Sequence, residues 1–168
     1  MRKGFTVIEL LVAIAVIGII ATIVVVSYNG TQNKAIDVSV RSDLDSIAGE
    51  LESYRVRAND ANPDKQFPRT KEQLETLEIM ASKQNYDTTL NYNMIYCIAN
   101  TGTEAYQQYK LIARSKAGTI FVMTEEGLAT HSLTAASFTS TLCSTLGMGL
   151  VSNGMYNVNT WQDWVHTG

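Results

Sequence analysis

The chain has 168 residues and a formal net charge of −3, and only 17% of its residues are charged. This length suits one domain with an attached segment and not two independent domains. The slightly acidic balance, with basic residues scattered along the chain, argues against nucleic-acid binding through bulk electrostatics. We therefore predict no direct nucleic-acid binding.

An apolar run extends from Phe5 to Val26 and contains one acidic residue, Glu9. As a helix, the run would span about 33 Å, which matches a hydrocarbon core of about 30 Å. Arg2 and Lys3 precede it and favour a cytoplasmic N-terminus. A charged side chain at membrane depth is unfavourable by about 2.5–3.5 kcal/mol on insertion scales. Glu9 therefore needs a compensating partner.

Two ordinary interpretations of this segment explain it incompletely. A secretory signal peptide has a shorter apolar region and ends at a small-residue cleavage site, whereas residues 27–30 read SYNG. A simple transmembrane helix fits the length, but it leaves Glu9 unexplained.

Residues 4–11 read GFTVIELL behind a short basic leader. The leader length, the Gly-Phe junction, the acidic residue and the apolar continuation together resemble the N-terminus of type IV prepilins and the related pseudopilins, which carry a class III signal peptide. The resemblance implies that prepilin peptidase cuts between Gly4 and Phe5. It also implies that Phe5 becomes N-methylated and that Glu9 sets the register of assembly.

Removal of residues 1–4 would leave a free α-amino group on Phe5 within the apolar phase. Two buried opposite charges offset each other's desolvation when they pair with good geometry, whereas either alone is strongly unfavourable. We expect Glu9 of an incoming subunit to pair with the Phe5 amine of its neighbour and so to fix the axial register.

A second helical pattern follows the apolar run, and one long helix is predicted from Phe5 to Arg57. Apolar residues recur at spacings of three and four, as on a helix with one buried face. The predicted organisation is a leader at 1–4, a transmembrane and polymerisation half at 5–28, and a globular head at 29–168 that includes the amphipathic half-helix 29–58. The apolar residues that recur on this face form a stripe along the helix and are Val40, Leu44, Ile47, Leu51 and Tyr54.

Residues 59–64 predict a turn that ends this helix. Their D-x-N-x-D spacing is faintly similar to a calcium loop, but Lys65 replaces the required Gly and Lys71 the closing Glu, so no metal site is predicted. Thr70 is a good N-cap with Gln73 three residues later, which predicts a short helix through about Lys83.

The rest of the head reads mainly as strands, at 90–98, 106–114 and 119–123. An antiparallel sheet packed on the amphipathic half of the long helix makes the fold class α+β. Residues 135–146 suit a short helix, and residues 161–164 (WQDW) suit a terminal turn over the sheet.

Cys97 and Cys143 are the only cysteines. In an exported protein one pair predicts one intramolecular disulfide, and two free thiols would suit a cytosolic protein instead. The apolar N-terminus favours the disulfide, which would close the C-terminal part of the head.

No catalytic motif is present. His131 and His166, the only histidines, have no partner motif, and the chain lacks H-E-x-x-H, G-x-S-x-G, C-x-x-C and a phosphate-binding glycine loop. We predict no enzymatic activity, no catalytic residue and no cofactor.

The resemblance implies a type IV pilin: a single-pass inner-membrane precursor with its head outside the cytoplasm, then a subunit of a surface pilus. Its implied partners are other pilin subunits, prepilin peptidase and an inner-membrane assembly platform. Adhesion and twitching motility are what it implies for pili generally. The alternatives are a pseudopilin of a type II secretion or competence (DNA-uptake) system, a minor pilin, and a bitopic membrane protein with an uncleaved helix.

Overall fold

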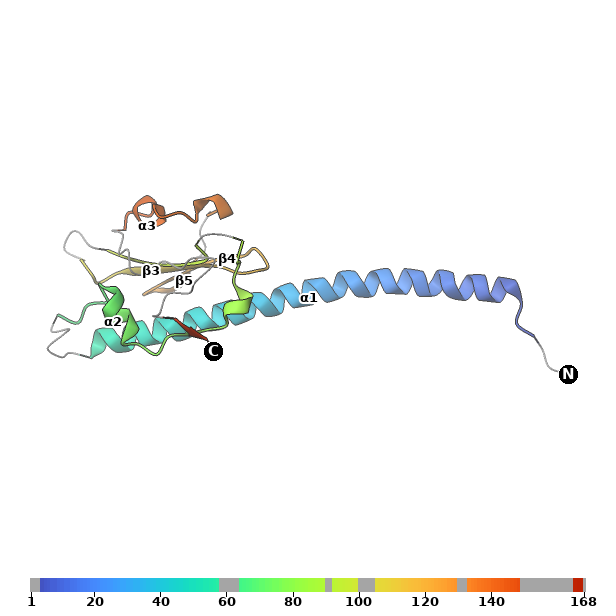
Figure 1. The fold of residues 1–168 in the computed structure, drawn as a ribbon, viewed down its shortest axis with the longest axis horizontal. Helices are drawn as coiled ribbons and strands as arrows, with labels where there is room; N and C mark the ends of the chain where they lie inside the picture. The colour runs from blue at the N-terminus through green and yellow to red at the C-terminus, as the bar shows by residue number, and fades with distance from the viewer. Residues whose placement is uncertain are drawn as a thin grey trace. The chain divides into compact units, whose positions relative to one another are not determined.

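The computed structural model describes residues 4–57, 64–89, 92–99, 105–129, 133–148 and 165–167. The chain divides into two units, residues 1–35 and residues 36–168, and helix α1 (Val7–Val56) contributes to both (Figure 1). The predicted long helix from Phe5 to Arg57 is confirmed within two residues at each end.

In the first unit, α1 carries an apolar surface on all sides. From Val7 to Val24 its side chains are exposed, including Ile8 at 70% and Ile17 at 65%. A helix that is hydrophobic all round is normally buried in a large core or in a membrane.

In the second unit, the same helix has one buried face. Val40, Leu44, Ile47 and Leu51 are at most 1% exposed, and Tyr54 packs partly buried against them. The predicted stripe is confirmed. It forms the core with one face of a four-stranded antiparallel sheet, ordered β2-β3-β4-β5.

The strands are β2 (Met94–Ile98), β3 (Tyr109–Arg114), β4 (Ile120–Thr124) and β5 (Gly127–Ala129). In register, Tyr96 lies opposite Leu111, which lies opposite Met123. The predicted antiparallel sheet is confirmed, but the first two strands begin three or four residues later than expected. The prediction also missed β5, which begins directly after a tight turn with Gly127 at a φ of 112°.

Strand β2 is buried on both faces. Tyr96 packs on the α1 side, whereas Ile95 and Cys97 pack toward the segment that contains α3 (Leu142–Thr145), on the opposite face of the sheet (Figure 1). A strand covered on both faces needs no polar positions, so its sequence MIYCI shows only imperfect alternation.

The helix predicted from Thr70 to Lys83 is wrong in length. Thr70 is the N-cap, and its side chain accepts a hydrogen bond from the Gln73 amide, but α2 (Lys71–Glu75) has only five residues. The chain continues as strand β1 (Met80–Ala81) and the 3₁₀ helix η1 (Lys83–Asn85). Strand β1 pairs in parallel with β6 (His166–Thr167), a non-local pairing that local pattern does not reveal.

The helix predicted at 135–146 is also wrong as a single element. A 3₁₀ helix, η2 (Ala135–Ser137), and α3 are separated by Phe138 and three hydroxyl residues. Thr139 and Thr141 hydrogen-bond each other through their hydroxyls at 2.9 Å, and such local bonds compete with helix formation. The predicted turn at 161–164, most of the 59–64 turn, and His131 lie outside the described residues.

Candidate functional site: the N-terminal half of α1

The segment Val7–Val24 is long and apolar enough to cross a membrane, judged by length and composition. None of it is buried inside the structure. The ring of Phe5, just before the helix, is 92% exposed. This surface is therefore available to lipid or to other apolar helices.

Thr6 and Glu9 form the start of the helix. The Thr6 amide and hydroxyl both donate hydrogen bonds to Glu9 Oε2, at 2.8 and 2.7 Å, and the Glu9 amide donates to Thr6 Oγ1 at 3.3 Å. Thr6 is the residue before the helix and Glu9 its third residue, so the pair is a capping box. The arrangement satisfies amide groups that would otherwise lack partners at a helix start.

The capping box gives Glu9 a partner in its own chain, which the sequence interpretation did not include. The signal was present, since T-x-x-E before an apolar run marks a capping box. In the uncleaved chain, the Phe5 nitrogen is a peptide nitrogen bonded to Gly4, so it carries no charge. Cleavage between Gly4 and Phe5, methylation of Phe5 and the pairing of Glu9 between subunits stay predictions.

The head contains the predicted disulfide. Cys97 of β2 and Cys143 of α3 are bonded, with 5.3 Å between their Cα atoms, and both are fully buried. Phe138 and Leu142 pack beside them in a second apolar cluster. The disulfide therefore attaches the α3 segment to the sheet face opposite α1.

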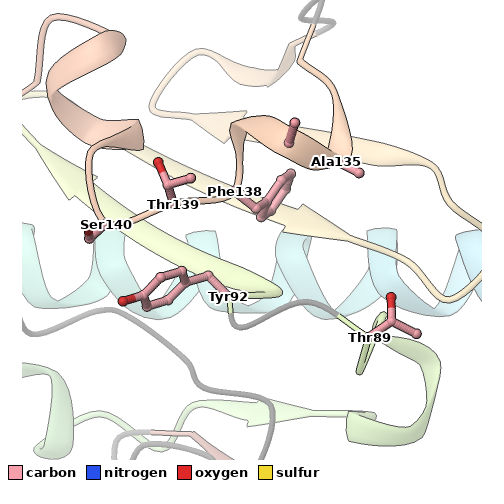
Figure 2. Close-up of a pocket in the computed structure, with 7 residues that line it drawn as sticks. Thr89, Tyr92, Ala135, Phe138, Thr139 and Ser140 are labelled. Carbon is pink, nitrogen blue, oxygen red and sulfur yellow. The ribbon is translucent and has the colours of Figure 1, made fainter.

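A pocket of about 410 Å³ lies where the α3 segment meets the chain before β2 (Figure 2). The described residues of its lining contribute hydroxyl, aromatic and methyl groups and no charged side chain. The described lining residues are Thr89, Tyr92, Ala135, Ala136, Phe138, Thr139 and Ser140.

The buried phenols of the core have structural roles. The hydroxyl of Tyr96 donates to the Pro68 carbonyl at 3.1 Å, and that of Tyr109 to the Thr124 carbonyl at 3.2 Å. Burial raises the pKa of both tyrosines, which keeps them neutral. Among the described residues, no group of three or more His, Cys, Asp or Glu side chains is placed to hold a metal ion.

Comparisons with known proteins agree with the N-terminal resemblance. Residues 1–25 match the family model of the prokaryotic N-terminal methylation motif. The chain is 32% identical over 76 residues to type II secretion system core protein G of Klebsiella pneumoniae. The matched residues make up 45% of this chain and 50% of that protein. The same-named protein of Escherichia coli K12 is 30% identical over 76 residues, 45% of this chain and 48% of that protein.

The chain thus spans about half the length of the curated relatives it matches. No solved structure matches it. The N-terminal segment carries the methylation motif of prepilin-like proteins, and the relatives bear the name of a secretion-system protein and not that of a pilus subunit.

Proposed function

We propose that this chain is the structural subunit of a filament that polymerises through the apolar half of α1. Prepilin peptidase cleaves it after Gly4, and Phe5 becomes its N-methylated first residue. The leader is then residues 1–4, the polymerisation segment 5–28, and the head 29–168. Before assembly, the subunit is held in the membrane as a single-pass precursor.

The observation that carries this proposal is the exposed apolar helix with one acid near its start. Between Val7 and Val24 no described side chain packs on the rest of the chain. Lipid covers such a surface before assembly, and copies of the same helix cover it in a filament. Packing of many apolar helices around a shared axis then holds the filament together.

Glu9 supplies the specificity of this packing. Once Phe5 carries a free amine, that cation and the carboxylate of Glu9 on a neighbouring subunit can neutralise each other in a medium where neither is stable alone. The pair forms at one axial offset only, so it selects the register that apolar packing leaves open.

Two kinds of filament fit this mechanism. Both curated relatives described above are called type II secretion system core protein G, which favours a pseudopilin of a secretion apparatus. A surface pilus subunit, major or minor, is the other candidate, and the buried disulfide suits an exported head of either kind. Deleting the gene separates them: a pseudopilin is required for protein secretion, and a major pilin for long surface filaments.

Mass spectrometry of the mature N-terminus tests the processing. A chain that begins at N-methylated Phe5 supports the proposal, and an intact Met1 in assembled material contradicts it. Glu9→Ala tests assembly: insertion into the membrane should persist while filament growth is lost or disordered. Wild-type filaments from that variant would contradict the role of Glu9.

A further inference from the structure

The pocket beside the α3 segment has two walls that come from distant parts of the chain. One wall precedes β2 and contains Thr89 and Tyr92, and the other leads into α3 and contains Phe138, Thr139 and Ser140. In Figure 2 the rings of Tyr92 and Phe138 lie between Ser140 at one end and Thr89 at the other. The volume of about 410 Å³ lies within the range of small-molecule pockets, about 300–1,000 Å³.

The two walls are fixed to each other. The disulfide between Cys97 and Cys143 links β2 to α3. Phe138 is only 5% exposed and lies in the apolar cluster that surrounds this bond, and Tyr92 packs against the same cluster. A ligand that enters the pocket therefore does not have to order its walls, which lowers the entropic cost of binding.

The hydroxyl groups of the pocket differ in how they are held. The Thr89 hydroxyl donates to the Asp87 carboxylate at 2.6 Å, and that carboxylate also pairs with Arg114. The proton of the Thr89 hydroxyl is therefore engaged, and its oxygen is left to accept from a ligand. The hydroxyls of Tyr92 and Ser140 have no partner among the described residues, so each can donate or accept.

Both chain segments that form the walls lack charged residues. Residues 88–92 and 127–162 contain no Asp, Glu, Lys or Arg, although 17% of the whole chain is charged. Asp87, just before the first wall, is neutralised by Arg114. An ionic ligand would lose part of its hydration here and would gain no opposite charge from these segments, which is unfavourable. The pocket therefore favours a neutral ligand that carries its own hydrogen-bonding groups.

We propose that this pocket binds a neutral sugar unit of a carbohydrate. The C–H groups on the face of a sugar ring can pack on the aromatic ring of Tyr92, and the hydroxyls along its edge can pair with Thr89 and Ser140. A purely apolar ligand would displace water from these hydroxyls without replacing its hydrogen bonds, which lowers affinity. The inference does not depend on processing or assembly, because both walls belong to one chain.

Saturation-transfer NMR on the full chain tests this proposal. The protein is kept in a zwitterionic detergent without a sugar headgroup, because maltoside and glucoside detergents would compete for the pocket. The probes are the methyl glycosides of glucose, galactose and N-acetylglucosamine, and methyl glucuronide is the charged counterpart of the glucose probe. We expect saturation transfer to at least one neutral probe, with a Kd in the millimolar range, and weaker transfer to the glucuronide.

Variants of the lining residues assign the binding to this pocket. Tyr92→Ala removes the stacking surface and should raise the Kd by about tenfold, and Ser140→Ala removes one hydroxyl and should raise it by about threefold. Tyr92→Phe keeps the ring and should weaken binding less than Tyr92→Ala, which separates loss of the ring from disturbance of the fold. Ser144→Ala is the matched control, because Ser144 is an exposed hydroxyl of α3 outside the pocket, and it should leave the Kd unchanged.

Four results would overturn the proposal. The first is the absence of saturation transfer to all three neutral probes. The second is a Kd that stays unchanged in both Tyr92→Ala and Ser140→Ala, since the sugar would then bind elsewhere. The third is stronger transfer to the glucuronide than to the neutral probes. The fourth is an equal loss of affinity in Ser144→Ala, because the effect would then not belong to the pocket.

Discussion

The Glu9 carboxylate is bound by Thr6 across the first turn of α1, with Glu9 Oε2 2.7 Å from the Thr6 hydroxyl and 2.8 Å from its amide. The same carboxylate is the one proposed to bind the amine of a neighbouring subunit. The capping box leaves part of the carboxylate free, since an ionised carboxylate has about four lone-pair sites. Glu9 can therefore begin the helix in the single subunit and still accept a second partner in the filament.

Glu9→Gln separates these two roles. Glutamine can also complete a capping box, so the start of the helix should be preserved, but it carries no charge to offset the Phe5 amine. We expect normal membrane insertion with strongly reduced assembly, measured as the sheared filament fraction. Thr6→Val is the matched variant, because it removes the N-cap hydroxyl and keeps the Glu9 carboxylate. Loss of the cap should lower the stability of the helix by about 1 kcal/mol. If Glu9→Gln assembles normally, the charge is unnecessary.

Removing the disulfide should destabilise the head. Cys97→Ala with Cys143→Ala opens a link across 46 residues of sequence, and loss of a native disulfide from a small exported domain lowers the free energy of unfolding by about 2–5 kcal/mol. Denaturant unfolding of the full chain in detergent measures this. Hydrogen exchange should rise most at residues 133–148, which the bond attaches to β2. Equal stability with and without the bond would contradict the assignment.

The buried stripe predicts a contrast within one helix. Leu44 is fully buried and Val38 is 66% exposed. Leu44→Ala should lower the free energy of unfolding by about 2–5 kcal/mol, because it removes buried methyl groups and leaves a cavity. Val38→Ala should change it by less than about 0.5 kcal/mol. Thermal unfolding followed by circular dichroism measures both, and similar losses would show that this face is not the core.

Features with local causes could be predicted from the sequence. The apolar run and the stripe through Leu44 repeat with helical period, and Thr70 precedes its helix with a typical capping pattern. The Cys97–Cys143 disulfide could be predicted because the chain has only two cysteines and an N-terminal segment typical of exported proteins. Each of these features depends on residues close by in sequence or, for the disulfide, on the number of cysteines.

Features with distant partners could not be predicted. Strand β1 pairs with β6 across more than 80 residues, and its two residues resemble the end of a helix when seen alone. Asp37 accepts a hydrogen bond from the Ser115 hydroxyl and Asp43 from the Tyr86 hydroxyl. These donors lie far away in sequence, and no local pattern marks the contacts. The capping role of Glu9 is indicated locally by Thr6, three residues earlier. It was missed because Glu9 was interpreted only as a charge within the membrane.

Alkaline pH should destabilise the head. Burial raises the pKa of Tyr96 and Tyr109 above the value of about 10 that an unfolded tyrosine has. The folded state therefore holds these protons more tightly, so its stability is fully present below about pH 10 and falls as the pH rises further. Tyr109→Phe removes one such group and should flatten this decline, measured by denaturant unfolding between pH 8 and 11. A decline of the same steepness in Tyr109→Phe would mean that other groups cause the alkaline loss.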